Sequence, residues 1–135
     1  MPKPLIQLKD ITRQYVNGEV ITKALCGVSF DIEAGEFVSI MGPSGSGKST
    51  LMHIIGFLDT FTSGTYFFED HDVGKFDDDE LAHMRQDNVG FVFQAFNLLS
   101  KSTVLNNVLL PMVYGDLSKT ERMKRAERAI AAVSL

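Results

Sequence analysis

Apolar residues gather in short runs that are separated by turn residues and that alternate with stretches of helical periodicity. Short apolar runs bounded by Gly, Asn, Asp or Ser are typical of strands, whereas apolar residues three or four positions apart are typical of helices. The pattern predicts strands over residues 5–15, 20–22, 28–32, 36–41, 66–68 and 89–94, turns at 17–18 and 62–65, and helices beginning near residues 48, 77, 103 and 118. This alternation, after a first part rich in strands, predicts an α/β fold.

Two of the predicted helices carry capping residues at their start. Asp77 is placed to accept from the first turn of its helix while Glu80 reaches back, which is the capping-box arrangement. Ser118 and Glu121 repeat this spacing at the beginning of the last helix. We therefore expect both helices to begin at these caps.

Residues 42–50, Gly-Pro-Ser-Gly-Ser-Gly-Lys-Ser-Thr, match the pattern G-x-x-x-x-G-K-[ST] at every fixed position. The predicted strand 36–41 precedes this segment and a predicted helix follows it, which is the context in which the pattern forms a phosphate-binding loop. The candidate binding residues are Gly42, Ser44, Gly45, Ser46, Gly47, Lys48, Ser49 and Thr50.

The chemistry of this loop suits a nucleotide triphosphate. Glycines allow the backbone to fold back so that its N–H groups point inward, and the start of the following helix adds free N–H groups and a positive dipole end. Lys48 supplies a full charge to the β- and γ-phosphates, the Ser49 hydroxyl is a ligand for Mg²⁺, and Thr50 is placed to donate to an inner phosphate. The sequence thus predicts a nucleotide site.

Composition and charge limit the partners of the chain. Its 135 residues carry a formal net charge of −4, which gives no general attraction to nucleic acid. The single cysteine, Cys26, excludes an internal disulfide and suits a reducing compartment. No apolar run approaches the roughly 20 residues of a membrane helix, so we expect no direct membrane insertion.

A phosphate-binding loop alone does not separate kinases, GTPases, helicases and transporter ATPases, but its surroundings are more specific. A long β-rich stretch precedes the loop, Tyr15 comes just before a turn, and Gln94 ends a predicted buried strand. This order resembles the ATP-binding-cassette (ABC) family, with its aromatic adenine platform, phosphate loop and glutamine loop.

The resemblance is nearest to the macrolide-exporter and lipoprotein-releasing branch of that family, and it spans almost the whole chain. It is carried by the segments 8–10, 18–20, 24–25, 42–50, 58–59, 62–64, 90–94 and 96–99, together with Tyr15. The fold that it implies is an N-terminal antiparallel β layer, a parallel core sheet around the phosphate loop, and the start of a helical subdomain. Residues 1–94 would form the nucleotide-binding core and residues 95–135 the start of the helical subdomain.

The resemblance also implies roles for individual residues, with ATP and Mg²⁺ as cofactors. Tyr15 would stack on adenine, and Gln94 would contact Mg²⁺ and the attacking water. Lys48 and Gln94 would then be the catalytic residues of this chain, and Ser49 and Gln94 its metal ligands. If the resemblance is set aside, Tyr15 is interpreted as a packing residue at the end of a strand, and Gln94 as a polar residue that ends a strand.

The partners that the resemblance implies are a transmembrane permease subunit or domain and a second ATPase domain in a head-to-tail dimer. Phe96, Leu98 and Leu99 would line the groove for the permease, although packing beneath the helical subdomain is an alternative. The function implied is an ABC-type ATPase that couples ATP hydrolysis to export or extraction of a substrate. Such a subunit lies on the cytoplasmic face of the inner (plasma) membrane as a peripheral protein.

The chain reaches Leu135 before any L-S-G-G-Q signature or any strand ending in Asp-Glu, so we expect it to be the N-terminal part of such a domain. The 135 residues alone are then expected to be inactive in steady-state hydrolysis. Without the strand that the family adds, apolar cover would be missing from Phe37, Ile40, Phe91 and Phe93.

Three other interpretations remain at this point. A soluble ABC-type ATPase of DNA repair or of ribosomes would need basic surfaces or a long insertion. A P-loop kinase would need an arginine-rich lid and a shorter first part. A non-catalytic nucleotide-binding fragment is compatible with the leading interpretation.

Overall fold

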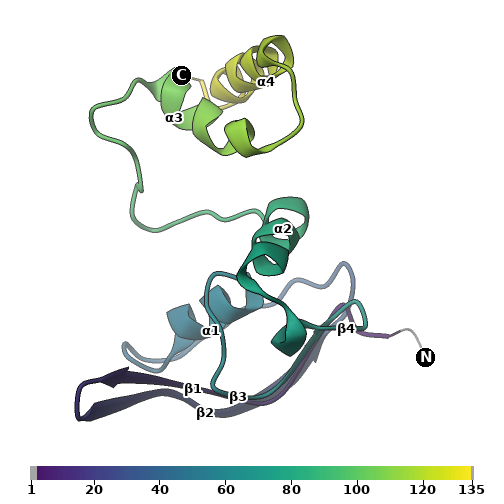
Figure 1. Cartoon of the computed structure of the whole chain (residues 1–135), viewed down its shortest axis with the longest axis vertical. Coiled ribbons are helices and arrows are strands. Elements are labelled where there is room, and N and C mark those ends of the chain that lie inside the picture. The colour runs from purple at the N-terminus through teal and green to yellow at the C-terminus, as the bar shows by residue number, and fades with distance from the viewer. Residues whose placement is uncertain (1–2, 135) are drawn as a thin grey trace. The chain divides into compact units, whose positions relative to one another are not determined.

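The computed structural model describes residues 3–134 and divides the chain into two compact units. The first extends to Phe91 and the second begins at Val92, and each is described by itself. The first unit contains the sheet with helices α1 and α2, and the second contains α3 and α4 (Figure 1). The assignment of residues 1–94 and 95–135 to a core and a subdomain stays a prediction.

A four-stranded antiparallel sheet forms the base of the first unit. Its strands are β1 (Ile6–Asn17), β2 (Val20–Ile32), β3 (Ser63–Phe68) and β4 (His71–Asp72), in the order β2-β1-β3-β4. The hairpin between β1 and β2 turns at Gly18, whose φ of 63° is the left-handed conformation that glycine adopts readily. The predicted first strand and the turn after it are confirmed.

Two predictions about this sheet are wrong in detail. The strands predicted over 20–22 and 28–32 are one strand. The β1–β2 ladder continues through the residues between them, with Ala24 and Gly27 as bulge-like extra residues that have no partner in β1. The turn predicted over 62–65 is largely strand, since Ser63 pairs with Thr12 in β1. Gly64 makes this pairing possible, because a Cβ there would lie 2.6 Å from the Asp10 carbonyl oxygen.

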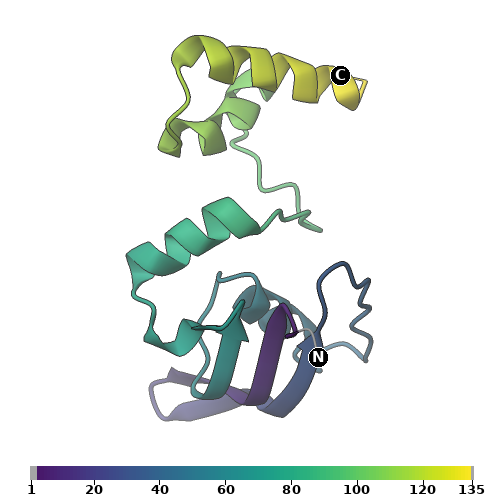
Figure 2. The ribbon, with the colours of Figure 1, turned by 90° about the vertical axis from the view of Figure 1, so that its right-hand side faces the viewer.

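The core of the first unit lies between this sheet and helix α1 (Lys48–Ile55), which covers one face of the sheet (Figure 2). Leu51 and Ile54 are the buried residues of α1, at the spacing expected for one helix face. The other buried apolar side chains around them include Ile6, Leu8, Ile11, Leu25, Phe57, Tyr66, Phe68, Val73 and Leu81.

Tyr66 ties the sheet to the end of α1. Its side chain is fully buried, its ring stacks on Phe57 with 5.7 Å between centroids, and its hydroxyl donates to the Ile55 carbonyl oxygen at 2.8 Å. That carbonyl belongs to the last turn of α1, where no intrahelical donor is available. Burial raises the pKa of the Tyr66 hydroxyl well above its usual value.

Beyond the sheet, the first unit continues with the short 3₁₀ helix η1 (Val73–Lys75) and helix α2 (Asp78–Asn88). The predicted capping box is confirmed: Asp77 accepts from the Glu80 N–H at 2.8 Å, and Glu80 accepts from the Asp77 N–H at 2.9 Å. Arg85 on α2 donates to the Phe57 carbonyl oxygen, which connects α2 to the segment after α1.

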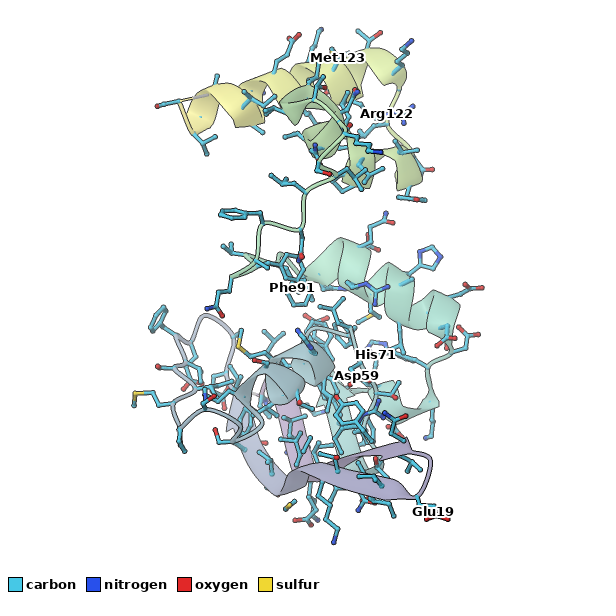
Figure 3. The ribbon with its side chains drawn as sticks, turned by 90° about the vertical axis from the view of Figure 1, so that its left-hand side faces the viewer. Glu19, Asp59, His71, Phe91, Arg122 and Met123 are labelled. Carbon is cyan, nitrogen blue, oxygen red and sulfur yellow. The ribbon has the colours of Figure 1, made fainter. Side chains whose placement is uncertain are left out.

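The second unit contains α3 (Val104–Leu109), the 3₁₀ helix η2 (Leu110–Tyr114) and α4 (Lys119–Ala132). Ser118 caps α4, as predicted. Helix α3 begins where the sequence predicted, and Thr103 caps it. The Glu121 carboxylate accepts from Arg125 at 3.2 Å instead of completing the capping box that the sequence predicted. Ala126 on α4 is buried, and Met123, labelled in Figure 3, is half-buried.

The segments predicted as parallel core strands, 36–41 and 89–94, are not strands within residues 3–134. A strand is stabilised by ladder hydrogen bonds, and a parallel core strand also needs apolar cover on both faces. Neither segment belongs to the described four-stranded sheet. Phe37 is accordingly 95% exposed and Phe93 is exposed, whereas Ile40 and Phe91 are half-buried.

No helix among the described residues is long and apolar enough to cross a membrane.

Replacing Tyr66 with phenylalanine should lower the free energy of unfolding by about 1–2 kcal/mol, because the Ile55 carbonyl loses a buried donor. The measurement is urea denaturation followed by circular dichroism. Tyr114→Phe is the matched control, because Tyr114 is exposed. Equal losses in the two variants would contradict the role of the buried hydroxyl.

The same tyrosine predicts an alkaline limit to stability. Because burial raises its pKa in the folded state, the unfolded chain ionises first, near the ordinary tyrosine value of about 10. The stabilisation that comes from keeping the Tyr66 hydroxyl protonated is therefore fully present below that pH, and it is lost as the pH rises above it. Tyr66→Phe should make the unfolding free energy fall less steeply above about pH 10.

Candidate phosphate-binding site

The loop between residue 41 and helix α1 has the folded-back conformation expected of a phosphate cradle. The Ser46 N–H donates to the Pro43 carbonyl oxygen at 3.3 Å, which closes a turn inside the loop. Gly45 and Gly47 have φ values of 79° and 89°, a region that residues with a Cβ rarely adopt. The glycines of the motif thus provide the backbone shape on which an inward-facing set of N–H groups depends.

Gly47 also meets a packing constraint. A Cβ at this position would lie 2.4 Å from the Ala24 carbonyl oxygen and 2.8 Å from Leu25 Cδ2. The loop is therefore seated directly on strand β2, closer than any side chain would allow. Gly42 is a second tight position, where a Cβ would lie 2.7 Å from Ser46 Oγ.

Helix α1 begins at Lys48 with Gly47 as its N-cap, and among the described residues no side chain caps it. The first-turn N–H groups, which have no intrahelical partner, therefore remain available to an anion. Its first turn also contains no acidic residue. Ser49 and Thr50 lie in that turn, so their hydroxyls belong to the same helix end.

The Lys48 ammonium lies across the loop itself. Its Nζ donates to the Pro43 carbonyl oxygen at 2.6 Å and to Ser46 Oγ at 3.3 Å. These are two neutral acceptors at the rim of the loop, and a phosphate is a stronger partner for an ammonium group because the bond is then charge-assisted on both sides. The loop, the open helix end and this lysine form a donor set that fits a nucleotide triphosphate tail.

The loop and Tyr15 line one open cavity of about 590 Å³. Tyr15 comes from β1 and is 39% exposed, so the β1–β2 hairpin brings an aromatic ring to the rim of the phosphate cradle. The residues that line this cavity are Tyr15, Thr22, Lys23, Ala24, Ser44, Gly45, Gly47, Lys48, Ser49 and Thr50.

Gln94 belongs to the second unit. Its predicted contact with Mg²⁺ and with the attacking water stays a prediction. No group of three or more His, Cys, Asp or Glu side chains that would hold a metal ion occurs among residues 3–134. The role of the Ser49 hydroxyl as a metal ligand stays a prediction; such a ligand would suit an ion that arrives with phosphate oxygens as its other ligands.

Residues that the sequence did not assign also reach this site. Thr22 and Lys23 line the cavity because β2 pairs with β1, and Tyr15 lies directly opposite Thr22 in that ladder. Arg13 and Asp59 contact the Tyr15 side chain: the Arg13 guanidinium lies over its ring, and Asp59 accepts from its hydroxyl. The only sequence signal was the position of Arg13 two residues before Tyr15, on the same face of a predicted strand.

Comparison with known proteins places these features in a family. The sequence pattern of the family described as "ABC transporter" matches residues 25–135. The macrolide export ATP-binding/permease protein MacB of Marinobacter nauticus is 50% identical over 134 residues, which cover 99% of this chain and 21% of that protein. The uncharacterized ABC transporter ATP-binding protein YknY of Bacillus subtilis is 49% identical over 97% of this chain and 57% of its own length.

The fold agrees with the sequence comparison. The dimeric, post-hydrolysis structure of the ATP-binding cassette MJ0796, bound to ADP and Pi, matches with a TM-score of 0.84 and 47% identity, over 96% of this chain and 57% of that one. The chain thus spans about a fifth of the macrolide exporter and somewhat more than half of the other two proteins. This similarity confirms the ABC fold class and the resemblance to the macrolide-exporter type, and we conclude that the chain belongs to the ABC transporter family.

Proposed function

We propose that this chain binds ATP with Mg²⁺ and forms the ATP-binding part of an ABC transporter that exports or extracts its substrate through a membrane permease. The observation that carries the proposal is the cavity that joins Tyr15 to the phosphate loop. A base and a triphosphate are the two ends of one nucleotide, and this cavity presents an aromatic ring for one and a donor-rich loop for the other.

Each residue of the loop has a role in this proposal. The N–H groups of residues 44–48 would hold the phosphates, and Lys48 would leave its two neutral acceptors to pair with the β- and γ-phosphates. Ser49 would hold the metal, and Thr50 would donate to an inner phosphate. Mg²⁺, when bound with the nucleotide, neutralises charge that develops on the phosphates.

Hydrolysis requires groups that these 135 residues do not carry. We assign Gln94 to the metal and to the attacking water, as the family resemblance implies. The glutamate that polarises this water and the signature motif of a second ATPase domain complete the site in that family. The dimeric form of the similar cassette MJ0796 supports a second ATPase domain as partner, and the head-to-tail arrangement is the one that the family resemblance implies.

The permease partner is supported by two observations. The macrolide export relative is named as an ATP-binding/permease protein, so an ATPase and a permease occur in one chain there. In the second unit Phe96 is 90% exposed, and Leu98 and Leu99 are exposed as well, which is apolar surface of the kind that partners cover. We propose that the protein lies at the cytoplasmic face of the inner (plasma) membrane, as the family resemblance implies, as a peripheral subunit or domain.

Replacing Lys48 with alanine should weaken ATP binding by more than about 100-fold, because a charged contact to two phosphates is lost. Tyr15→Ala should cost less, about 10-fold, which lies toward the lower end of the ~1–3 kcal/mol for one stacked base. Titration with a fluorescent ATP analogue measures both. Lys124→Ala is the charge-matched control, because Lys124 is exposed on α4; equal losses at Lys48 and Tyr15 would argue against the assigned roles.

Replacing Gly47 with alanine should abolish nucleotide binding and destabilise the first unit, because its Cβ would clash with the Ala24 carbonyl. Gly45→Ala is the matched control. It also has a positive φ but nothing within 4 Å of its Cβ, so it should cost only about 1–2 kcal/mol of backbone strain. Thermal unfolding and ATP titration of the pair measure the difference, and identical behaviour would contradict close seating of the loop on β2.

The 135-residue chain should release no phosphate in steady state above background, although it binds ATP. The physical reason is that the family resemblance assigns the base that polarises the water to a glutamate outside these 135 residues. A phosphate-release assay at saturating ATP and Mg²⁺ measures this. Multiple turnover that disappears in Lys48→Ala would show that the chain completes the catalytic site by itself.

A further inference from the structure

The Tyr15 ring is held by two charged residues that belong to different parts of the chain. Its hydroxyl donates to Asp59 Oδ2 at 2.7 Å, and the guanidinium carbon of Arg13 lies 4.6 Å from the centre of its ring. Arg13 Nη2 donates to the other carboxylate oxygen of Asp59 at 2.6 Å. The three side chains therefore form a closed triangle in which each contacts the other two.

This triangle is anchored more firmly than an ordinary surface ion pair. The side chains of Arg13 and Asp59 are only 20% and 22% exposed. Asp59 Oδ1 also accepts from the Thr60 N–H at 2.8 Å, and Arg13 Nη1 donates to Thr60 Oγ1 at 3.3 Å. Figure 3 shows Asp59 at the end of α1, beside the sheet. The carboxylate is thus oriented by its own backbone turn before it contacts Tyr15.

The two faces of the Tyr15 ring are not equivalent. Arg13 covers one face, and Arg13 is not among the described residues that line the loop cavity, whereas Tyr15 is. A planar partner would therefore stack on the face opposite Arg13. A cation over one face of an aromatic ring and a base over the opposite face is an arrangement in which both contacts are favourable.

Asp59 also connects this ring to the phosphate loop through the covalent chain. It follows α1, the helix whose first residue is Lys48. The segment after it is joined to β1 on both sides of Arg13. The Thr62 N–H donates to the Thr12 carbonyl oxygen at 2.8 Å, and the Gln14 N–H donates to Thr62 Oγ1 at 2.9 Å. The far end of the phosphate-loop helix therefore sets the position of the strand that carries Tyr15.

We propose that Asp59, together with Arg13, is a positioning residue for the base platform: it fixes the Tyr15 ring in the stacking orientation before the nucleotide binds. The inference rests on the proposed nucleotide site. It adds that the affinity for the base depends on Asp59 and Arg13, which hold Tyr15. An exposed tyrosine that was free to rotate would lose side-chain entropy on stacking, and a ring already held by Asp59 and Arg13 avoids that loss.

The test separates the base from the phosphates. ATP and inorganic tripolyphosphate, each with Mg²⁺, are titrated against the 135-residue chain and its Tyr15→Phe and Asp59→Ala variants. Tyr15→Phe keeps the ring and removes only the contact to Asp59. Each variant should bind ATP about 3- to 10-fold more weakly, as expected for one side chain that must be immobilised, and should bind tripolyphosphate as the wild type does.

The double variant completes the test. If Asp59 acts through the hydroxyl, Tyr15→Phe/Asp59→Ala should lose no more ATP affinity than the single variants, because both changes remove the same contact. Asp70→Ala is the control, since Asp70 forms an exposed ion pair with Lys3 away from the cavity, and it should leave both titrations unchanged.

Contrary outcomes fall into distinct kinds. Wild-type affinity for ATP in Tyr15→Phe would overturn the inference, whether or not Asp59→Ala folds. A loss shared equally by ATP and tripolyphosphate would overturn it as well, because it would show that Asp59 supports the fold only. A wild-type chain that binds neither ligand, or a Lys48→Ala variant that binds both normally, would contradict the proposed nucleotide site itself.

Discussion

The close seating of the phosphate loop on strand β2 is the constraint on which the rest of the site depends. Gly47 has a left-handed backbone and lies where a Cβ would clash with the Ala24 carbonyl oxygen. This contact sets where α1 begins, and therefore where its free N–H groups point. Because β2 pairs with β1, the same contact sets the distance between the loop and Tyr15. The cradle and the aromatic ring are thus held by one pair of strands.

Helix α1 is fixed to the sheet at both ends. Its start is held by the loop on β2, and its last turn is held by the Tyr66 hydroxyl on the Ile55 carbonyl. The segment that follows returns to β1 through Asp59 and its neighbours, where it contacts Arg13 and Tyr15. A helix held in this way presents its N-terminus with little freedom, and a rigid donor set loses less entropy when it binds phosphate.

The chain supplies one side of a larger catalytic arrangement in the function that we propose. The first unit offers the cradle and the platform, and the second carries Gln94 and exposed apolar residues that suit a partner. The family resemblance implies this division, since it assigns one site to groups from several segments and from two domains. The exposed apolar segment around Phe37 is consistent with such dependence on further sheet partners.

The sequence by itself determined the features that depend on local chemistry. The phosphate loop, the start of α1, the hairpin at Gly18 and the Asp77 cap follow from glycine conformations and from side chains that bond to nearby backbone, so neighbouring residues suffice to predict them. Only the tertiary structure decided that residues 63–65 join β3 and that residues 36–41 stay unpaired, because strand pairing depends on partners far along the chain. The contacts of Arg13 and Asp59 with Tyr15 were also visible only in the tertiary structure. No local pattern specifies these contacts, which exist because the sheet and α1 pack in one particular way.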